Sequence, residues 1–397
     1  MFAFFDTLRK ATRRAVLMPL AALALAACDP SALTNIGGIS GGPRIDTSAP
    51  VPVALLVPRG SGQASDDLLA RNLENAARLA MRDLNGVEID LRVYGTAGNP
   101  QTAASQAALA VNDGARIILG PLYAEAANAA GVAVAANGVN VLAFSNNTTI
   151  AGGNVFVLGS TFDNTASRLV DYAASQGRDR MVIAHAQDVS GQLGRNAIQR
   201  AIARSGATLV GTVDYPLSQQ GVVDSVPRIK AAVDGGAANA VFLTSPSASA
   251  LPLLTQLLPE AGVSQASTQF IGLARWDIPT QTLDLPGVQG GWFALPDPAR
   301  AAAFRSQYQA AYGSAPHPLA GLAFDGIAAI GALASQGRSN ALTGAALTQG
   351  AGFQGATGIF RLRGDGTNQR GLAVATVRDN KVVVISPAPG GFGGTGF

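Results

Sequence analysis

The residues best able to do chemistry are polar groups that follow short apolar runs, where strands of a parallel sheet would end. His185 and His317 are the only histidines. A Ser-His-Asp triad is conceivable around His185, but no predicted strand leads into a Gly-x-Ser-x-Gly turn. A zinc site needs three or four ligands, and no His, Cys and carboxylate cluster supplies them. These residues suit hydrogen bonding of a ligand or partner better than catalysis, so we expect no enzyme, no metal and no cofactor.

Ligands of open parallel sheets bind beyond the carboxyl ends of the strands. His185 suits a place in such a cleft or a plain strand end, and Trp276 suits a ligand platform or a core position. Both readings stay open, whereas His317 is expected in a solvated loop. Eight residues at predicted strand ends make up the candidate ligand or partner cleft: Ser61, Tyr123, Ser145, Asn146, His185, Ser245, Arg275 and Trp276.

Alternating strands and helices must position these residues. Residues 53–57 form a continuous apolar run, which is typical of a strand buried on both faces. An amphipathic helix is predicted over 65–84, and Asn99-Pro100 has the cap and first-turn residues that begin the next one. The alternation continues to about residue 274 and predicts right-handed βαβ crossovers. The number of strands favours two sheets over one, so we expect an α/β protein with two lobes.

The single cysteine, Cys28, ends Leu25-Ala26-Ala27-Cys28 behind a basic and then apolar segment. This order is typical of a secretory signal. The apolar run of 15–27 would span only about 20 Å as a helix, too short to cross a membrane. We therefore expect residues 1–27 to be a lipoprotein signal peptide and Cys28 to anchor the protein to a membrane by lipid. Residues 12–17 also resemble a twin-arginine signal, so both export routes stay open.

Residues 28–50 are rich in Gly, Ser and Pro and are expected to be a flexible linker. The predicted signal peptide contains four of the 28 Lys and Arg residues and one of the 25 Asp and Glu residues. Its removal leaves equal numbers of acidic and basic residues. No basic cluster follows Arg14, so nucleic acid is excluded as a partner.

The order of these segments resembles the type 1 periplasmic binding fold of the leucine/isoleucine/valine-binding proteins. The resemblance covers 51 to about 385 and rests on Gly120-Pro121-Leu122 and Ala143-Phe144-Ser145-Asn146. It implies two doubly wound parallel-sheet lobes joined by three crossing segments. Lobe one would take 51–160 and 293–345. Lobe two would take 161–292 and 346–390, with Phe353–Arg361 completing it.

Within this fold the sequence departs from the amino-acid binders. Tyr123 stands where they carry a serine after Gly-Pro, and Leu193-Gly194 stands where they carry Tyr-Gly, whereas Ala143 and Ser145 match their pattern. Two further segments, Gly290-Gly291-Trp292-Phe293-Ala294 and Pro387-Ala388-Pro389, look like those of the penicillin-binding protein activator lipoproteins.

That second resemblance makes a periplasmic activator of peptidoglycan synthesis our first hypothesis. It would be held by lipid on the inner or outer membrane and would act by contact with a peptidoglycan synthase. The alternative is the solute-binding lipoprotein of an ABC importer for amino acids or similar small molecules, with an ABC permease as partner. A hydrolase using His185 is the third hypothesis.

Overall fold

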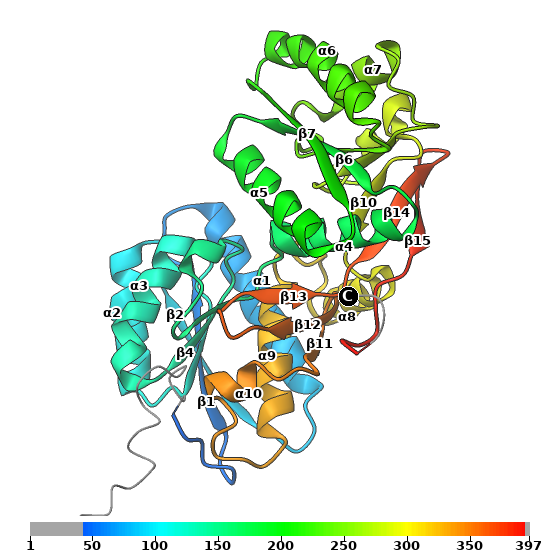
Figure 1. The fold of residues 1–397 in the computed structure, drawn as a ribbon. Helices are drawn as coiled ribbons and strands as arrows, with labels where there is room; N and C mark the ends of the chain where they lie inside the picture. The colour runs from blue at the N-terminus through cyan, green and yellow to red at the C-terminus, as the bar shows by residue number, and fades with distance from the viewer. Residues whose placement is uncertain (1–42, 394–397) are drawn as a thin grey trace, which may run out of the picture. The chain divides into compact units, whose positions relative to one another are not determined.

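The computed structural model describes residues 43–393, which form two α/β lobes (Figure 1). The sheet of lobe one is parallel throughout, with the strand order β2-β1-β3-β4-β5. Its strands are β1 (Val51–Val57), β2 (Ile89–Gly95), β3 (Ile117–Leu119), β4 (Asn140–Ala143) and β5 (Val155–Val157). This is a doubly wound order, as predicted.

Lobe two has a seven-stranded sheet with the order β15-β14-β10-β9-β8-β6-β7. Its strands are β6 (Arg180–Ala186), β7 (Thr208–Tyr215), β8 (Ala240–Leu243), β9 (Gln269–Gly272), β10 (Trp292–Leu295), β14 (Ala373–Arg378) and β15 (Lys381–Ser386). Strands β6 to β10 are parallel, and β14 and β15 add two antiparallel strands at one edge. The predicted α/β class with two parallel-sheet lobes is therefore confirmed.

Helices cover both faces of each sheet. On lobe one, α1 (Ala64–Arg82), α8 (Pro298–Tyr312), α9 (Gly321–Ala334) and α10 (Gly344–Leu347) contribute to one buried cluster, and α2 (Pro100–Asn112) and α3 (Ala124–Val134) to the other. On lobe two, α4 (Phe162–Ser175) and α5 (Val189–Arg204) cover one face, and α6 (Gln219–Gly236) and α7 (Leu251–Glu260) the other. Short 3₁₀ turns lie at Ala135–Asn137, Thr148–Ile150, Thr280–Asp284 and Pro286–Val288.

Strand β1 shows why its sequence lacks polar alternation. Val53 and Leu55 belong to one buried cluster, and Ala54 and Leu56 belong to the cluster on the opposite face. Successive side chains of a strand point to opposite faces, so a strand covered on both sides must be apolar throughout. The predicted helix start is also confirmed, because the Asn99 side chain accepts a hydrogen bond of 3.0 Å from Thr102 N with Pro100 in the first turn.

The chain passes between the two lobes three times, as the fold class implies. The crossing segments are residues 158–161, 296–297 and 371–372, which follow β5, β10 and the small sheet described next. Among the described residues, no helix is long and apolar enough to cross a membrane. The predicted signal peptide, Cys28 and most of the linker lie outside the described residues.

A three-stranded antiparallel sheet, β11 (Phe353–Gly355), β12 (Gly358–Leu362) and β13 (Asn368–Arg370), differs from our expectation. We assigned this region to lobe two, but Phe353, Phe360 and Leu362 are buried in a cluster of lobe one. The physical reason is the register: Phe353 pairs with Phe360, and their rings, 5.5 Å apart, share the cluster with apolar residues of α9. Lobe two resumes only at β14. Strand β10 likewise lies in the sheet of lobe two, so lobe one resumes after 295 rather than at 293.

Candidate functional site: a pocket at the three crossing segments

The main candidate site is a pocket of about 500 Å³ that touches all three crossing segments. Gly159 and Ser160 come from the first crossing, Pro296 from the second, and Gly371 and Leu372 from the third. The other lining residues follow β3 and β4, lie at the start of α9, or belong to the small sheet: Leu122, Tyr123, Ala124, Phe144, Ser145, Asn146, Asn147, Pro318, Leu319, Gly321, Leu322, Asp325, Thr357, Ile359 and Arg370. Its volume is typical of small-molecule sites.

Tyr123 forms part of the wall next to α3 and is 41% exposed. Its hydroxyl donates a hydrogen bond of 2.6 Å to the Asp66 carboxylate at the start of α1. This bond, together with partial burial, raises the pKa of Tyr123 to about 12. The ring also lies against Gly98, where a Cβ would come within 3.0 Å of it. Tyr123 is thus a neutral aromatic side chain held in place from both sides.

Ser145 and Asn146 follow β4 and lie at the edge of the pocket next to the first crossing segment. Ser145 is buried, and its hydroxyl accepts a hydrogen bond of 3.1 Å from Asn147 N. Its carbonyl accepts another from Gly159 N at 3.0 Å. A Cβ at Gly159 would lie 2.6 Å from that carbonyl oxygen, so only glycine permits this close approach. The hydroxyl of Ser145 keeps its own proton for a ligand.

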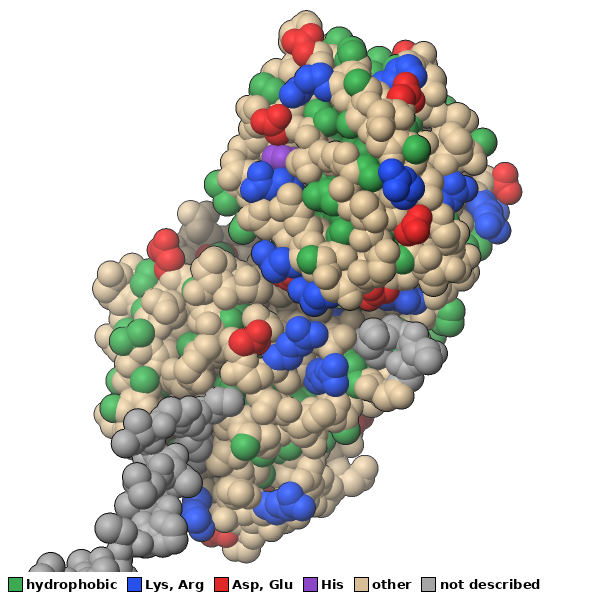
Figure 2. Space-filling view, viewed as in Figure 1, with side chains coloured by type: hydrophobic (Ala, Val, Ile, Leu, Met, Phe, Trp, Pro, Cys, Tyr) green, Lys and Arg blue, Asp and Glu red, His purple; other side chains and the backbone are tan. Residues whose placement is uncertain are grey.

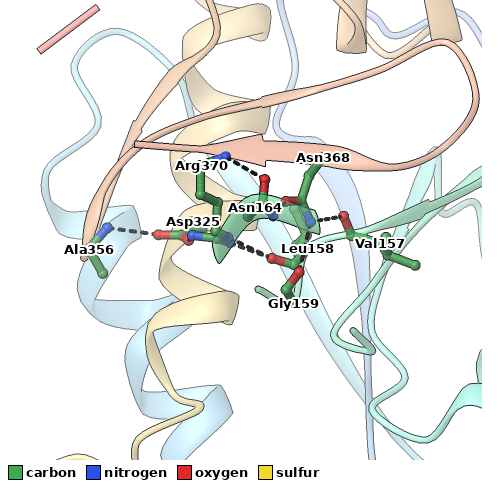
Figure 3. Close-up of polar contacts among 8 residues, drawn as sticks. All are labelled: Val157, Leu158, Gly159, Asn164, Asp325, Ala356, Asn368 and Arg370. Atoms are coloured by element: carbon green, nitrogen blue, oxygen red, sulfur yellow. Dashed lines mark hydrogen bonds and ion pairs between the residues drawn. The ribbon is translucent and has the colours of Figure 1, made fainter. Parts of the chain in front are cut away.

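A buried ion pair lies beneath the pocket (Figure 3). Arg370 of β13 donates to the Asp325 carboxylate of α9 at 2.8 Å and, through Nε at 3.0 Å, to the carbonyl of Leu158 in the first crossing. The second oxygen of Asp325 accepts a hydrogen bond of 2.7 Å from Ala356 N. Burial raises the pKa of Asp325, and the Arg370 charge and the Ala356 N–H oppose that shift.

Two asparagines extend this network into lobe two (Figure 3). Asn164 of α4 donates to the Asn368 side chain at 2.7 Å and accepts from Arg370 N at 3.1 Å. Asn368 in turn donates to the carbonyls of Val157 and Gly159, each at 2.8 Å. One continuous set of hydrogen bonds therefore joins α9, the small sheet, the first crossing segment and α4, which fixes the backbone that the pocket is built on.

The electrostatics of the pocket follow from this network. Within the described chain, Asp325 and Arg370 are the only charged residues that line it, and each is neutralised by the other. A ligand therefore meets apolar side chains, hydroxyls and amides with no unpaired charge. Such a surface orients a small molecule by shape and by a few hydrogen bonds. In the part of the chain that the structure describes, no group of three His, Cys, Asp or Glu residues is placed to hold a metal ion.

The predicted cleft residues of lobe one and lobe two have different surroundings. Tyr123, Ser145 and Asn146 line the pocket together, whereas Ser61 lies in the loop after β1 and is not among the lining residues. Its hydroxyl accepts a hydrogen bond of 3.1 Å from Gln63 N, so it has a local role at the start of α1.

The four predicted residues of lobe two do not reach the pocket. Ser245 is buried, and its hydroxyl lies 2.7 Å from that of Tyr215. His185 is buried, with Nδ1 2.8 Å from the carbonyl of Ala186. Arg275 pairs with Asp277, so its charge is engaged locally.

Of the two readings of Trp276, a ligand platform or a core position, the structure supports the core position, and its place in the candidate cleft is corrected. Its side chain has no exposed surface and lies 6.2 Å from the Phe293 ring, centroid to centroid. A Cβ at Gly291 would come within 2.0 Å of the indole, and one at Gly272 within 2.1 Å, so the chain leaves space for the ring at two glycines. Trp276 is a core residue of lobe two.

Sequence reasoning missed the Asp325–Arg370 pair and the pocket wall around it. One signal was available: Asp325 is the only charged residue in the apolar segment that forms α9. A lone carboxylate in an otherwise buried helix needs a partner. The partner, Arg370, lies 45 residues later, and nothing in the sequence pattern connects the two.

The family comparison agrees with this architecture. Residues 50–381 match the model of a family described as periplasmic binding protein, and the chain belongs to that family. Membership implies a location outside the cytoplasm. No curated protein sequence matches the chain.

Solved structures share the fold at low identity. One is a branched-chain amino acid ABC transporter periplasmic ligand-binding protein from Burkholderia xenovorans LB400, 18% identical, with a TM-score of 0.62 over 85% of this chain and 96% of that one. Another is an ABC transporter substrate-binding protein from Desulfitobacterium hafniense in complex with Leu, 18% identical, with a TM-score of 0.59 over 85% and 100%. A third is a solute-binding protein of an ABC transporter from Rhodopseudomonas palustris BisB5 in complex with 3,4-dihydroxybenzoic acid. It is 18% identical, with a TM-score of 0.53 over 86% of this chain and 98% of that one.

Proposed function

We propose that this protein binds a small molecule in the pocket at the crossing segments and delivers it to an ABC importer. The observation that carries the proposal is the pocket itself, which joins hydrogen-bonding groups of lobe one to all three crossing segments. A ligand in this position would contact the segments that connect the lobes. The family and the names of the similar structures support a binding role rather than catalysis.

The lining also limits the ligand class. Asp325 and Arg370 neutralise each other, so the pocket offers no free charge to pair with an ionic group. Tyr123 supplies an aromatic face, and Ser145 and Asn146 supply hydrogen bonds. We infer that the ligand is a compact molecule with an apolar or aromatic body and polar groups at one end. Amino acids with apolar side chains and hydroxylated aromatic acids both have such a body, and their ionised groups would be held by hydrogen bonds to neutral groups such as those of Ser145 and Asn146 rather than by ion pairs.

Thermal unfolding with a panel of amino acids and benzoic acids tests the proposal. A ligand at 100 times its dissociation constant stabilises the folded protein by about 2.7 kcal/mol. We expect at least one compound to raise the melting temperature of the wild type, and Ser145→Ala to reduce that shift. Ser61→Ala is the matched control, because Ser61 is outside the pocket and should leave the shift unchanged. No shift across the panel would remove the proposal.

The contact activator of a peptidoglycan synthase is the weaker candidate. Two residues of the segment that suggested it have structural roles: Gly291 gives space to Trp276, and Trp292 packs edge-to-face on Tyr172 at 5.0 Å. Packing explains these residues without a partner. A pull-down that recovers a peptidoglycan synthase with wild-type protein would favour the activator over the importer component.

We also propose that Cys28 carries a lipid and tethers the folded residues to a membrane. The support is the sequence alone, since small residues precede this single cysteine behind a basic and apolar segment. Cys28→Ser should release the protein into the soluble fraction of cells that express it. Mass spectrometry of the wild type that finds an unmodified Cys28 would contradict the proposal.

A further inference from the structure

A second hollow, of about 460 Å³, has a very different lining from the first. It is formed by α4 and α5 of lobe two together with the turn between β12 and β13 and Thr148 of lobe one. Arg370 lines both hollows, but the remaining residues of the second are distinct: Thr148, Thr161, Asp163, Asn164, Ser167, Arg168, Asp171, Arg200, Arg204, Arg363, Asp365, Thr367, Asn368 and Gln369.

Arginine is concentrated here. Five arginines line the hollow against three aspartates. Figure 2 shows Lys and Arg side chains, with some Asp and Glu, gathered on this face around α5 and the β12–β13 region. Two of the five arginines have carboxylate partners: Arg200 pairs with Asp163 at 2.9 Å, and Arg370 pairs with the buried Asp325.

The other three arginines have no carboxylate within ion-pair distance among the described residues. Arg204 donates one hydrogen bond to the Ser167 hydroxyl at 3.0 Å. Arg168 donates to the Leu372 carbonyl and the Ser386 hydroxyl, and it interacts electrostatically with Asp171 without forming an ion pair. Asp171 interacts electrostatically with Arg204 and Arg168 without an ion pair, and Asp365 accepts a hydrogen bond from Thr367. The five arginines outnumber the three lining aspartates and Asp325 together, so the local charge balance is positive.

A fourth arginine next to this group adds to the excess. Arg361 is on β12, and Arg363 follows the end of that strand. Arg361 donates a hydrogen bond of 2.9 Å to the Gln369 side chain rather than to a carboxylate. Burial lowers the pKa of Arg361, and the positive charge of Arg363 lowers it further. An anion bound here would relieve the repulsion between these neighbouring guanidinium groups.

We propose that this hollow binds a phosphate monoester through Arg204, Arg363 and Arg168. Guanidinium groups pair bidentately with phosphate oxygens, and a phosphate has enough acceptors for several arginines at once. The Ser167 hydroxyl accepts from Arg204 and keeps its own proton to donate to a further oxygen. The hollow exceeds one phosphate group in volume, so the anion carries an organic body. Because both lobes contribute residues, the bound anion bridges them.

Calorimetric titration of the full chain with glycerol phosphate tests the site, with sodium chloride of equal ionic strength as the reference. We expect saturable binding to the wild type. Arg204→Gln and Arg363→Gln should each weaken it roughly tenfold, because each removes a charged hydrogen-bond donor. Arg305→Gln on α8, which does not line the hollow, is the matched control. Both substituted arginines are exposed, so circular dichroism should find the variants folded.

A parallel arm distinguishes a soluble ligand from a lipid headgroup. The Cys28→Ser chain is sedimented with vesicles that contain phosphatidic acid, whose headgroup is a phosphate monoester, and with vesicles of neutral lipid. Binding to free glycerol phosphate assigns a soluble ester, and binding only to anionic vesicles that Arg204→Gln abolishes assigns a headgroup. Absence of binding in both arms, or an equal loss in Arg305→Gln, would overturn the proposal.

Discussion

The carboxyl ends of the strands differ between the two lobes, although both sheets are doubly wound. In lobe one, the residues after β3 and β4 face a pocket, and Tyr123, Ser145 and Asn146 line it. In lobe two, Ser245 and Trp276 occupy equivalent places after β8 and β9 but are buried among their own neighbours. Strand topology thus determines where a ligand site can form, and local packing determines which strand ends line it.

The largest expected change in stability tests whether Trp276 is a core residue of lobe two. Trp276→Ala removes a fully buried indole and should lower the free energy of unfolding by about 3–5 kcal/mol. Urea unfolding measures the loss. The folded fraction should still bind the panel ligand with unchanged affinity, because the residue is outside the pocket. A stability loss under about 1 kcal/mol with loss of binding would make Trp276 a ligand platform after all.

The next effect concerns the ion pair beneath the pocket. Asp325→Asn leaves the Arg370 charge buried without its counter-ion and should cost about 3 kcal/mol of unfolding free energy. Asp163→Asn is the matched control, because its Arg200 partner is half exposed and such pairs contribute less than about 1 kcal/mol. Equal losses for the two variants in urea unfolding would contradict the structural role given to the buried pair.

A smaller effect separates stability from binding at two serines. Ser245→Ala removes the hydrogen-bond partner of the buried Tyr215 hydroxyl and should cost about 1 kcal/mol of stability. It should leave ligand affinity unchanged. Ser145→Ala should do the reverse, with weaker binding and little change in unfolding, because the Asn147 N–H that the hydroxyl accepts from belongs to an exposed residue that water can reach. Calorimetric titration with the panel ligand gives the affinity of each variant, and urea unfolding gives its free energy of unfolding. Weaker binding in Ser245→Ala together with a loss of stability in Ser145→Ala would refute the difference between the lobes.

The smallest effect is a titration. The hydrogen bond to Asp66 raises the pKa of Tyr123 to about 12, so this bond contributes stability below the unfolded value of about 10. The contribution is lost as the pH rises through about 12. Asp66→Asn should move the pKa of Tyr123 down toward 10. NMR titration of ¹³C-labelled tyrosine measures it, and an unchanged value would mean that Asp66 does not hold the ring.

The sequence predicts lobe architecture well because buried parallel strands and capped helices leave local signals. The apolar run of β1 and the Asn99-Pro100 helix start are examples. The lobe assignment of Phe353–Arg361 followed from resemblance and was wrong, since the pairing of Phe353 with Phe360 and their packing in the cluster that includes α9 depend on tertiary contacts.

Only part of the candidate site could be predicted, because the rest also depends on tertiary contacts. Tyr123 and Ser145 lie shortly after the ends of β3 and β4, so local sequence located them. Local sequence gave no indication that Ser245 would be turned inward, and it left the platform and core readings of Trp276 open. The Asp325–Arg370 pair depends on the packing of the small sheet against α9, which periodicity does not reveal.

The asymmetry between the lobes is tested most directly by hydrogen–deuterium exchange of the wild type with and without the first panel compound that raises its melting temperature. The account predicts that the compound slows exchange most strongly at residues 122–124 and 144–147, which follow β3 and β4. Slower exchange confined to 185–188, at the end of β6, and to 245–247, after β8, would contradict it and assign ligand recognition to lobe two.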